Sequence, residues 1–81
     1  MSWTERNGCL IREWRTPDFL TAHALVNAMV GPAEALGHHP DITFGWGYVR
    51  VVLTTHDAGG LTELDRRLAG AIDEVLKHLD L

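Results

Sequence analysis

The segment from Ile42 to Leu53 restricts the fold of this chain more than any other stretch. Two short runs rich in β-branched and aromatic residues flank Gly45-Trp46-Gly47, and tight hairpin turns favour glycine. With a two-residue loop at Trp46 and Gly47, position 45 pairs with 48 and 42 pairs with 51, so the apolar side chains of both runs share one face. The sequence therefore predicts an antiparallel hairpin with one face in the core.

Histidines lie beyond the two free ends of this hairpin. The same register places position 38 opposite 55, and a shift of half a residue places it opposite 56, so His38-His39 meets His56 in either case. Directly opposed side chains on antiparallel strands lie about 5 Å apart at Cβ. We expect His38 or His39 to flank one small site together with His56.

The chain before the hairpin reads as two strands and a helix. A short strand precedes the turn dipeptide Asn7-Gly8, and a second strand over 9–15 places Leu10, Arg12 and Trp14 on one face, with Trp14 in the core. Thr16-Pro17-Asp18 reads as a helix start, with Thr16 as the cap and Pro17 at the first helical position. We expect Gly37 to end this helix in a left-handed conformation.

This first helix carries an apolar stripe, with His23 beside it at the surface. Gly31-Pro32 interrupts the pattern, which predicts a kink or break, because proline removes a backbone hydrogen bond. The expected core positions are Phe19, Ala22, Val26, Met29, Val30 and Ala33.

A second helix follows the loop at 57–60. Thr62-x-x-Asp65 is a variant of the capping box, and an apolar stripe runs from Leu61 to Leu79. Asp65 has two interpretations: it caps the helix, which we favour, or it orients a histidine of the loop just before it.

Together these elements predict one domain over 1–81. Its fold is an α+β two-layer sandwich in which two helices cover one face of a four-stranded antiparallel sheet (β-β-α-β-β-α). The other sheet face is a natural dimer surface.

Size and charge exclude several classes of protein. With 81 residues the core is small, so oligomerisation would add stability. A formal charge of −4 with scattered Lys and Arg disfavours direct nucleic-acid binding, and no apolar run approaches the roughly 20 residues that cross a membrane. One cysteine, Cys9, allows neither an internal disulfide nor a cysteine metal cluster. We expect a cytoplasmic protein.

The histidine set suits acid–base chemistry. Imidazole, with an unperturbed pKa of about 6.5, gives and takes protons at neutral pH, and two such groups can protonate a leaving hydroxyl and deprotonate the adjacent atom. A zinc site at His38, His39, His56 and Asp57 is the competing interpretation, but neighbouring histidines in an extended segment face opposite ways. A phosphate site at Gly59-Gly60 lacks a lysine and the P-loop spacing.

His38-His39-Pro40, followed after the hairpin by the segment from Thr55 to Asp65, resembles the signature of the pterin-4a-carbinolamine dehydratases. Weaker similarity covers nearly the whole chain. The resemblance implies loss of water from 4a-hydroxytetrahydropterin to give quinonoid dihydropterin, in tetrahydropterin recycling, with no metal or separate cofactor. It also implies a homodimer or homotetramer.

The same resemblance implies the site residues. His38, His39 and His56 surround the pterin, and we assign His38 and His56 as the acid–base pair and His39 as the residue that holds the ring. Pro40, Thr55, Asp57 and Ala58 would line the pocket. Ile42 stands where many relatives have tryptophan, and Gly37 where many have an acidic residue, which implies a less polar and less enclosed pocket.

Two alternatives remain open. Dehydratase-like domains also serve as non-catalytic interaction modules, either transcriptional coactivators or assembly factors of a carbon-fixing enzyme. Retention of all three histidines favours catalysis here. The substrate could also be another pterin, such as a compound of the molybdopterin pathway.

Overall fold

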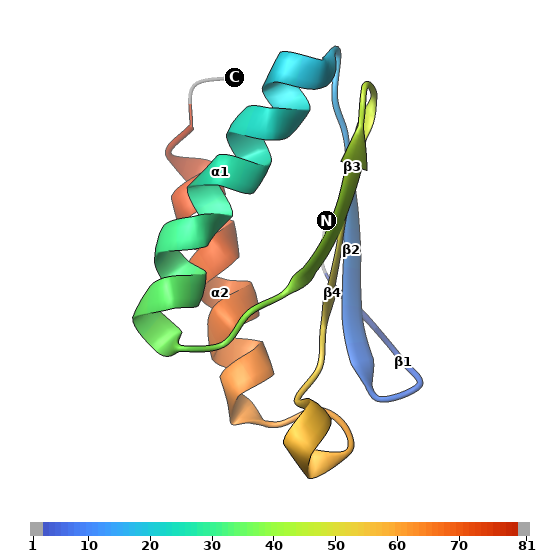
Figure 1. The fold of residues 1–81 in the computed structure, drawn as a ribbon, viewed down its shortest axis with the longest axis vertical. Helices are drawn as coiled ribbons and strands as arrows, with labels where there is room; N and C mark the ends of the chain where they lie inside the picture. Colours follow the sequence, from blue (N-terminus) through green and yellow to red (C-terminus); the bar gives the residue numbers. More distant parts are fainter. Residues whose placement is uncertain (1–2, 80–81) are drawn as a thin grey trace.

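The computed structural model describes residues 3–79 as a sheet with a helical layer (Figure 1). The sheet is antiparallel and has the strand order β1-β2-β4-β3, and both long helices cover the same face. This confirms the predicted α+β sandwich. In chain order the elements are β1 (Thr4–Arg6), β2 (Cys9–Arg15), α1 (Phe19–Leu36), β3 (Asp41–Gly45), β4 (Tyr48–Leu53), the 3₁₀ helix η1 (His56–Ala58) and α2 (Glu63–Lys77).

The β3–β4 hairpin has the predicted register. Gly45 pairs with Tyr48 and Ile42 with Val51, so Trp46 and Gly47 form the two-residue loop. β4 lies in the middle of the sheet, where alternate side chains are fully buried beneath the helices: Val49, Val51 and Leu53. The remaining core comes from the facing sides of α1 and α2 and from Leu10.

β2 pairs with β4 and carries a polar cluster under the helices. Arg12 Nη1 lies 2.8 Å from Asp73 Oδ1 on α2, and its guanidinium stacks 4.7 Å from the ring centre of Trp14. The indole N–H of Trp3 donates to the same carboxylate at 3.1 Å. A cavity of about 400 Å³ opens here, without a histidine in its walls. This cluster joins the start of the chain to α2.

The start of α1 differs from the prediction. Asp18, not Thr16, is the N-cap, and its carboxylate accepts the N–H of Thr21 at 2.8 Å. The Thr16 hydroxyl instead donates to the Trp46 carbonyl at 3.2 Å, and its N–H donates to the Gly47 carbonyl at 3.0 Å. Thr16 therefore binds the hairpin turn. Helix-capping preferences depend on neighbouring residues only, so they do not predict this tertiary contact.

α1 continues through Pro32 without the expected break. Pro32 removes only the backbone hydrogen bond to the Ala28 carbonyl, and packing against the sheet keeps the neighbouring turns helical. The buried positions are Ala22, Leu25, Met29 and Ala33. Leu25 was missing from the predicted stripe, while Phe19 and Val30 are 48% and 52% exposed.

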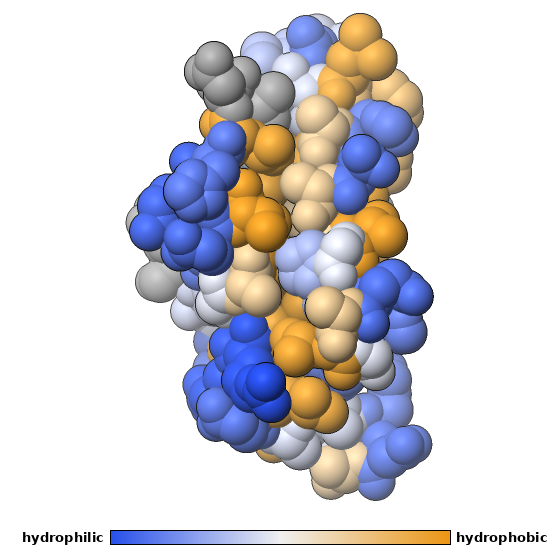
Figure 2. Space-filling model, turned by 90° about the vertical axis from the view of Figure 1, so that its left-hand side faces the viewer, coloured by the Kyte–Doolittle hydropathy of each residue, from blue (hydrophilic) through white to orange (hydrophobic). Residues whose placement is uncertain are grey.

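Figure 2 shows apolar side chains gathered in a band between hydrophilic ones when the molecule is seen from the helix side. The second apolar stripe is confirmed in its central part, because Leu68 and Ile72 of α2 are fully buried. Neither helix of residues 3–79 is long and apolar enough to cross a membrane.

Candidate functional site

The end of α1 sets the position of the paired histidines. Gly37 adopts the predicted left-handed conformation, with φ 62° and ψ 30°. The N–H of His38 then donates back to the Ala33 carbonyl at 3.1 Å. Such a reverse turn after a helix satisfies the last carbonyls and redirects the chain. His38-His39-Pro40 therefore leaves α1 and runs toward β3.

The opposite side of the site follows the end of β4. Thr55 and Gly60 exchange two backbone hydrogen bonds, of 3.2 and 3.3 Å, around the single turn of η1. Gly59 closes this turn with a φ of 76°. The sequence predicted an irregular loop from Asp57, whereas the structure has a 3₁₀ turn that begins at His56. This closed loop holds Thr55 and His56 beside the histidine pair.

The two sides flank an open cavity of about 290 Å³. The structure therefore brings together the three histidines that the hairpin register placed near one another. Of the predicted pocket residues, Pro40 lines a neighbouring cavity instead, and Ala58 lies exposed on η1 outside the walls of both. The walls of this cavity, which we call the histidine cavity, are Gly37, His38, His39, Thr54, Thr55, His56 and Asp57.

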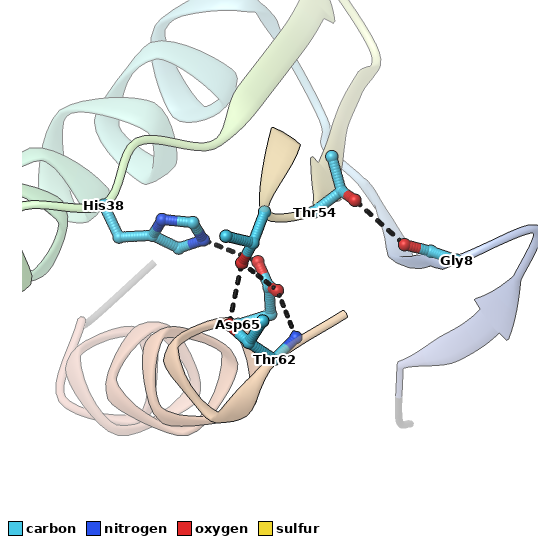
Figure 3. A network of polar contacts seen from close by, with 6 residues as sticks. Gly8, His38, Thr54, Thr62 and Asp65 are labelled. Carbon is cyan, nitrogen blue, oxygen red and sulfur yellow. Dashed lines mark hydrogen bonds and ion pairs between the residues drawn. The ribbon is translucent and has the colours of Figure 1, made fainter. Parts of the chain in front are cut away.

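Asp65 holds His38 from the first turn of α2 (Figure 3). Its Oδ1 lies 2.6 Å from His38 Nε2, and its Oδ2 accepts the Thr55 hydroxyl at 2.6 Å and the Thr62 N–H at 2.9 Å. The Asp65 side chain is fully buried, and that of His38 is only 12% exposed. Asp65 thus caps the helix and also orients a histidine. That histidine is His38, not one from the preceding loop, because α2 packs beside the end of α1.

The charge of Asp65 follows from these contacts. Burial raises the pKa of its carboxyl, but hydrogen bonds from Thr55, His38 and the Thr62 N–H lower it more, and the pKa ends below the ordinary 3.8. An ionised carboxylate only accepts hydrogen bonds, so His38 donates its Nε2–H. In the neutral ring, Nδ1 is then the nitrogen with the free lone pair.

A second hydroxyl supports this arrangement. Thr55 donates its single hydroxyl proton to Asp65. In the 2.8 Å hydrogen bond between the Thr55 and Thr62 hydroxyls, Thr62 is therefore the donor.

The Thr54 hydroxyl donates to the Gly8 carbonyl at 2.9 Å and so joins the β1–β2 turn to the cavity wall. Sequence reasoning missed Thr54 and Thr62 as site residues, although their place beside the histidine motif was a usable signal.

His39 and His56 are more open to solvent. His39 Nε2 lies 2.7 Å from Glu34 Oε2 on the last turns of α1, and both side chains are largely exposed. His56 is exposed at the start of η1, and its ring makes no side-chain hydrogen bond within residues 3–79. The two remaining histidines lie elsewhere: His23 is exposed near Phe44, and His78 pairs with Glu74.

The histidine cavity does not have the form of a metal centre. Among residues 3–79, no group of three or more His, Cys, Asp and Glu side chains is arranged to hold an ion. Of the three cavity histidines, His38 is bound to Asp65 and His39 to Glu34.

Comparison with known proteins shows which family the chain resembles. The family model described as "Pterin 4 alpha carbinolamine dehydratase" matches residues 1–75. A protein of Chloroflexus aurantiacus named "Putative pterin-4-alpha-carbinolamine dehydratase" is 50% identical over 74 residues, which are 91% of this chain and 80% of that protein. A protein of the same name from Trichormus variabilis is 47% identical over 73 residues, 90% of this chain and 78% of that protein.

Two solved structures have the same fold. A transcriptional coactivator/pterin dehydratase from Brucella melitensis superposes with a TM-score of 0.83 at 30% identity, covering 91% of this chain and 81% of that one. A pterin dehydratase-like protein described as a RuBisCO assembly factor in the alpha-carboxysome superposes with a TM-score of 0.73 at 24% identity, covering 93% and 89%. By the family model and these relatives, the chain belongs to the pterin-4a-carbinolamine dehydratase family.

Proposed function

We propose that this protein dehydrates 4a-hydroxytetrahydropterin to quinonoid dihydropterin, using its histidines as acid and base. The observation that carries the proposal is the histidine cavity, with His38 fixed by a buried carboxylate and His56 across from it. Its volume of about 290 Å³ is at the small end for ligand sites, as suits a compact bicyclic ring. Family membership supports the same reaction class.

The proposed reaction needs two proton transfers. An acid protonates the hydroxyl on C4a, the C4a–O bond breaks and water leaves, while a base removes the proton from N5 and the C4a=N5 double bond forms. We assign His38 as the base through Nδ1, because Asp65 holds Nε2–H and stabilises the imidazolium that forms. His56, exposed and without a competing partner among the described residues, is the acid.

The other residues of the cavity wall bind the substrate and transfer no proton. In this proposal His39 borders the ring, and Thr55 and Asp57 contribute polar edges. Pro40 and Ala58 stay predictions as pocket residues, to be tested through ligand binding. No metal or separate cofactor takes part in the proposed steps. A reducing cytoplasm suits both a tetrahydropterin and the single cysteine.

The test is the dehydration rate of chemically generated 4a-hydroxytetrahydropterin. We expect His38→Ala and His56→Ala each to lower kcat about 10²–10⁴-fold, as removal of a general acid or base does. His23→Ala is the matched control, since it removes an exposed histidine outside the cavity. Unfolding curves establish that the variants fold. A loss below tenfold for both cavity variants contradicts the proposal.

A second candidate is an interaction module without catalysis. It is favoured by the coactivator and assembly-factor descriptions of the two structural relatives, and by exposed apolar side chains on α1 and the hairpin tip: Phe19, Leu20, Val30 and Trp46. Normal folding with no dehydration of any pterin by the wild-type chain would favour this candidate.

We also propose a homo-oligomer formed through the uncovered sheet face. Ile11 and Val52 pair across β2 and β4 and point away from the helices. Sedimentation of Val52→Glu tests this contact, and a wild-type chain that sediments as a monomer would contradict it.

A further inference from the structure

The cavity of about 400 Å³ beside Arg12 is lined by side chains of β2, α1 and the end of α2. It shares no wall residue with the histidine cavity or with the cavity next to that one. A ligand bound here would therefore leave the proposed reaction site free. We call this space the Arg12 cavity; its walls are Arg12, Trp14, Leu25, Asp73, Leu76 and Lys77.

The guanidinium of Arg12 uses only part of its hydrogen-bonding capacity within the fold. Its Nη1 binds Asp73 Oδ1 at 2.8 Å, and its carbon lies 4.7 Å from the ring centre of Trp14. Its Nε is buried and has no hydrogen-bond partner among residues 3–79, and its Nη2 donates no hydrogen bond to them. Buried donors in native proteins usually have a partner, because an unpaired one is costly.

The unused donors define the chemistry of a partner. A guanidinium presents its N–H groups as a planar fork, which a carboxylate can bind through two parallel hydrogen bonds. Asp73 accepts only from Nη1, so the remaining donors, Nε and Nη2, are left for a second acceptor. Arg12 therefore points to an anionic ligand in the cavity that it lines.

The charges of the walls agree with an anion. The walls contain two cations, Arg12 and Lys77, and one carboxylate, that of Asp73. Asp73 pairs with Arg12, whereas Lys77 pairs with Glu74, 3.4 Å away and outside the walls. The Lys77 and Glu74 side chains are 70% and 61% exposed, and ion pairs of this kind contribute little. One positive charge of the walls is thus available to a ligand with one negative charge.

The remaining walls are apolar. Trp14 and Leu76 are half-buried, and Leu25 is buried. The cavity volume of about 400 Å³ lies within the usual range for small-ligand sites, which combine apolar walls with a few convergent polar groups. An inorganic anion would leave these apolar surfaces in contact with water, whereas a hydrocarbon group would cover them.

We propose that the Arg12 cavity binds a small monocarboxylate with an apolar body. Its carboxylate pairs with Arg12 and Lys77, and its hydrocarbon part lies against Trp14, Leu25 and Leu76. The Nε of Arg12 is covered in the structure, so the guanidinium turns toward the cavity when the carboxylate binds. This binding is independent of the proposed function, because the two sites have no residue in common.

The first test uses 3-phenylpropanoate as the probe, titrated into the full chain at pH 7 and followed by calorimetry. We expect saturable binding, with a Kd about tenfold or more below that of the uncharged 3-phenylpropanamide, because the amide lacks the charge-assisted hydrogen bonds. Acetate, which has the charge without the apolar body, should also bind about tenfold or more weakly. Equal binding of acid and amide, or no binding of the acid, would overturn the proposal.

Nuclear magnetic resonance tests the contact with Arg12 directly. On addition of 3-phenylpropanoate the Arg12 Nε–H signal should move downfield as it gains an acceptor. The Nε–H signal of Arg67, which is exposed on α2 outside the walls, should stay in place. Saturable binding that leaves the Arg12 signal unchanged would place the probe elsewhere and refute the site.

Two variants separate geometry from charge. Arg12→Lys keeps the positive charge beside Asp73 but lacks the planar fork, so the Kd of 3-phenylpropanoate should rise about tenfold or more. Lys77→Met removes an exposed charge and keeps most of the apolar stem, and should raise the Kd about threefold.

Arg67→Met is the matched control for Lys77→Met, because it removes an exposed cation from the same helix outside the walls. It should leave the Kd unchanged. Circular dichroism establishes that each variant folds, and Lys77→Met decides alone if Arg12→Lys does not. Equal effects of Lys77→Met and Arg67→Met would show attraction to net charge only and would overturn the proposal.

Discussion

His38 Nε2 lies 2.6 Å from Oδ1 of Asp65, a residue 27 positions later in the chain. Asp65 is fully buried in the first turn of α2, and it binds the histidine, a threonine hydroxyl and the backbone of its own helix cap together. One carboxylate therefore couples the start of a helix to the orientation of a cavity histidine.

Asp65→Asn should destabilise the fold and release His38. The amide would turn an N–H₂ donor toward groups that already donate, and leaving a buried donor unpaired costs about 1–3 kcal/mol. Urea unfolding measures the loss, and ¹⁵N chemical shifts of the His38 ring report whether Nε2 still carries the proton. Asp18→Asn is the control, because asparagine caps an exposed helix end about as well as aspartate. Equal stability losses at both sites would refute this prediction.

The same carboxylate predicts a pH dependence of stability. Because the folded-state pKa of Asp65 lies below its ordinary 3.8, its contribution is fully present above about pH 4 and disappears as the pH falls through the lowered value. The difference in unfolding free energy between wild type and Asp65→Asn should therefore shrink as the pH falls below about 4, where the Asp65 carboxylate takes up its proton. A difference that grows as the pH falls from 4 would show that the sign is wrong.

Thr55→Val should weaken the same network from the other side. It removes the hydroxyl that donates to Asp65 at 2.6 Å and accepts from Thr62 at 2.8 Å, while keeping the side-chain volume. Hydrogen bonds to charged groups contribute about 1.5–3 kcal/mol, so we expect a loss in that range. Thr55→Ser keeps the hydroxyl and should lose less than about 1 kcal/mol. Chemical denaturation measures both losses. A larger loss of unfolding free energy for Thr55→Ser than for Thr55→Val would show that the hydroxyl does not stabilise the fold.

Gly37→Ala should cost about 1–2 kcal/mol through backbone strain alone. Gly37 has a φ of 62°, and a Cβ there would meet no atom within 4 Å, so steric contact adds nothing. Gly70→Ala is the paired control, because that glycine lies in α2 with the same open space, and alanine favours helix by roughly 0.5–1 kcal/mol. Thermal melts should thus move in opposite directions, and a parallel shift would rule out the strain argument.

Much of the fold could be predicted because its signals are local. Alternating apolar residues and the glycines around Trp46 define the hairpin and its register, which the pairing of Ile42 with Val51 confirms. The left-handed Gly37 and the capping carboxylate of Asp65 were likewise predictable, since both follow from residues within one helical turn.

The errors share one physical cause. Thr16 was predicted to cap α1 but instead binds Trp46 and Gly47. Pro32 was predicted to kink or break α1, and the structure shows no break there, because packing against the sheet holds the helix continuous. In both cases a contact between distant segments outweighed a local preference, as tertiary packing commonly does.

The sequence by itself determined that the histidines at the two ends of the hairpin would meet, because a strand register fixes which positions lie opposite one another. Only the tertiary structure decided what each histidine faces. The packing of α2 beside the end of α1 brings Asp65 to His38, while His39 turns to Glu34 and borders both the histidine cavity and the cavity next to it. Side-chain direction after a helix end depends on neighbouring elements, and no local pattern in the sequence specifies it.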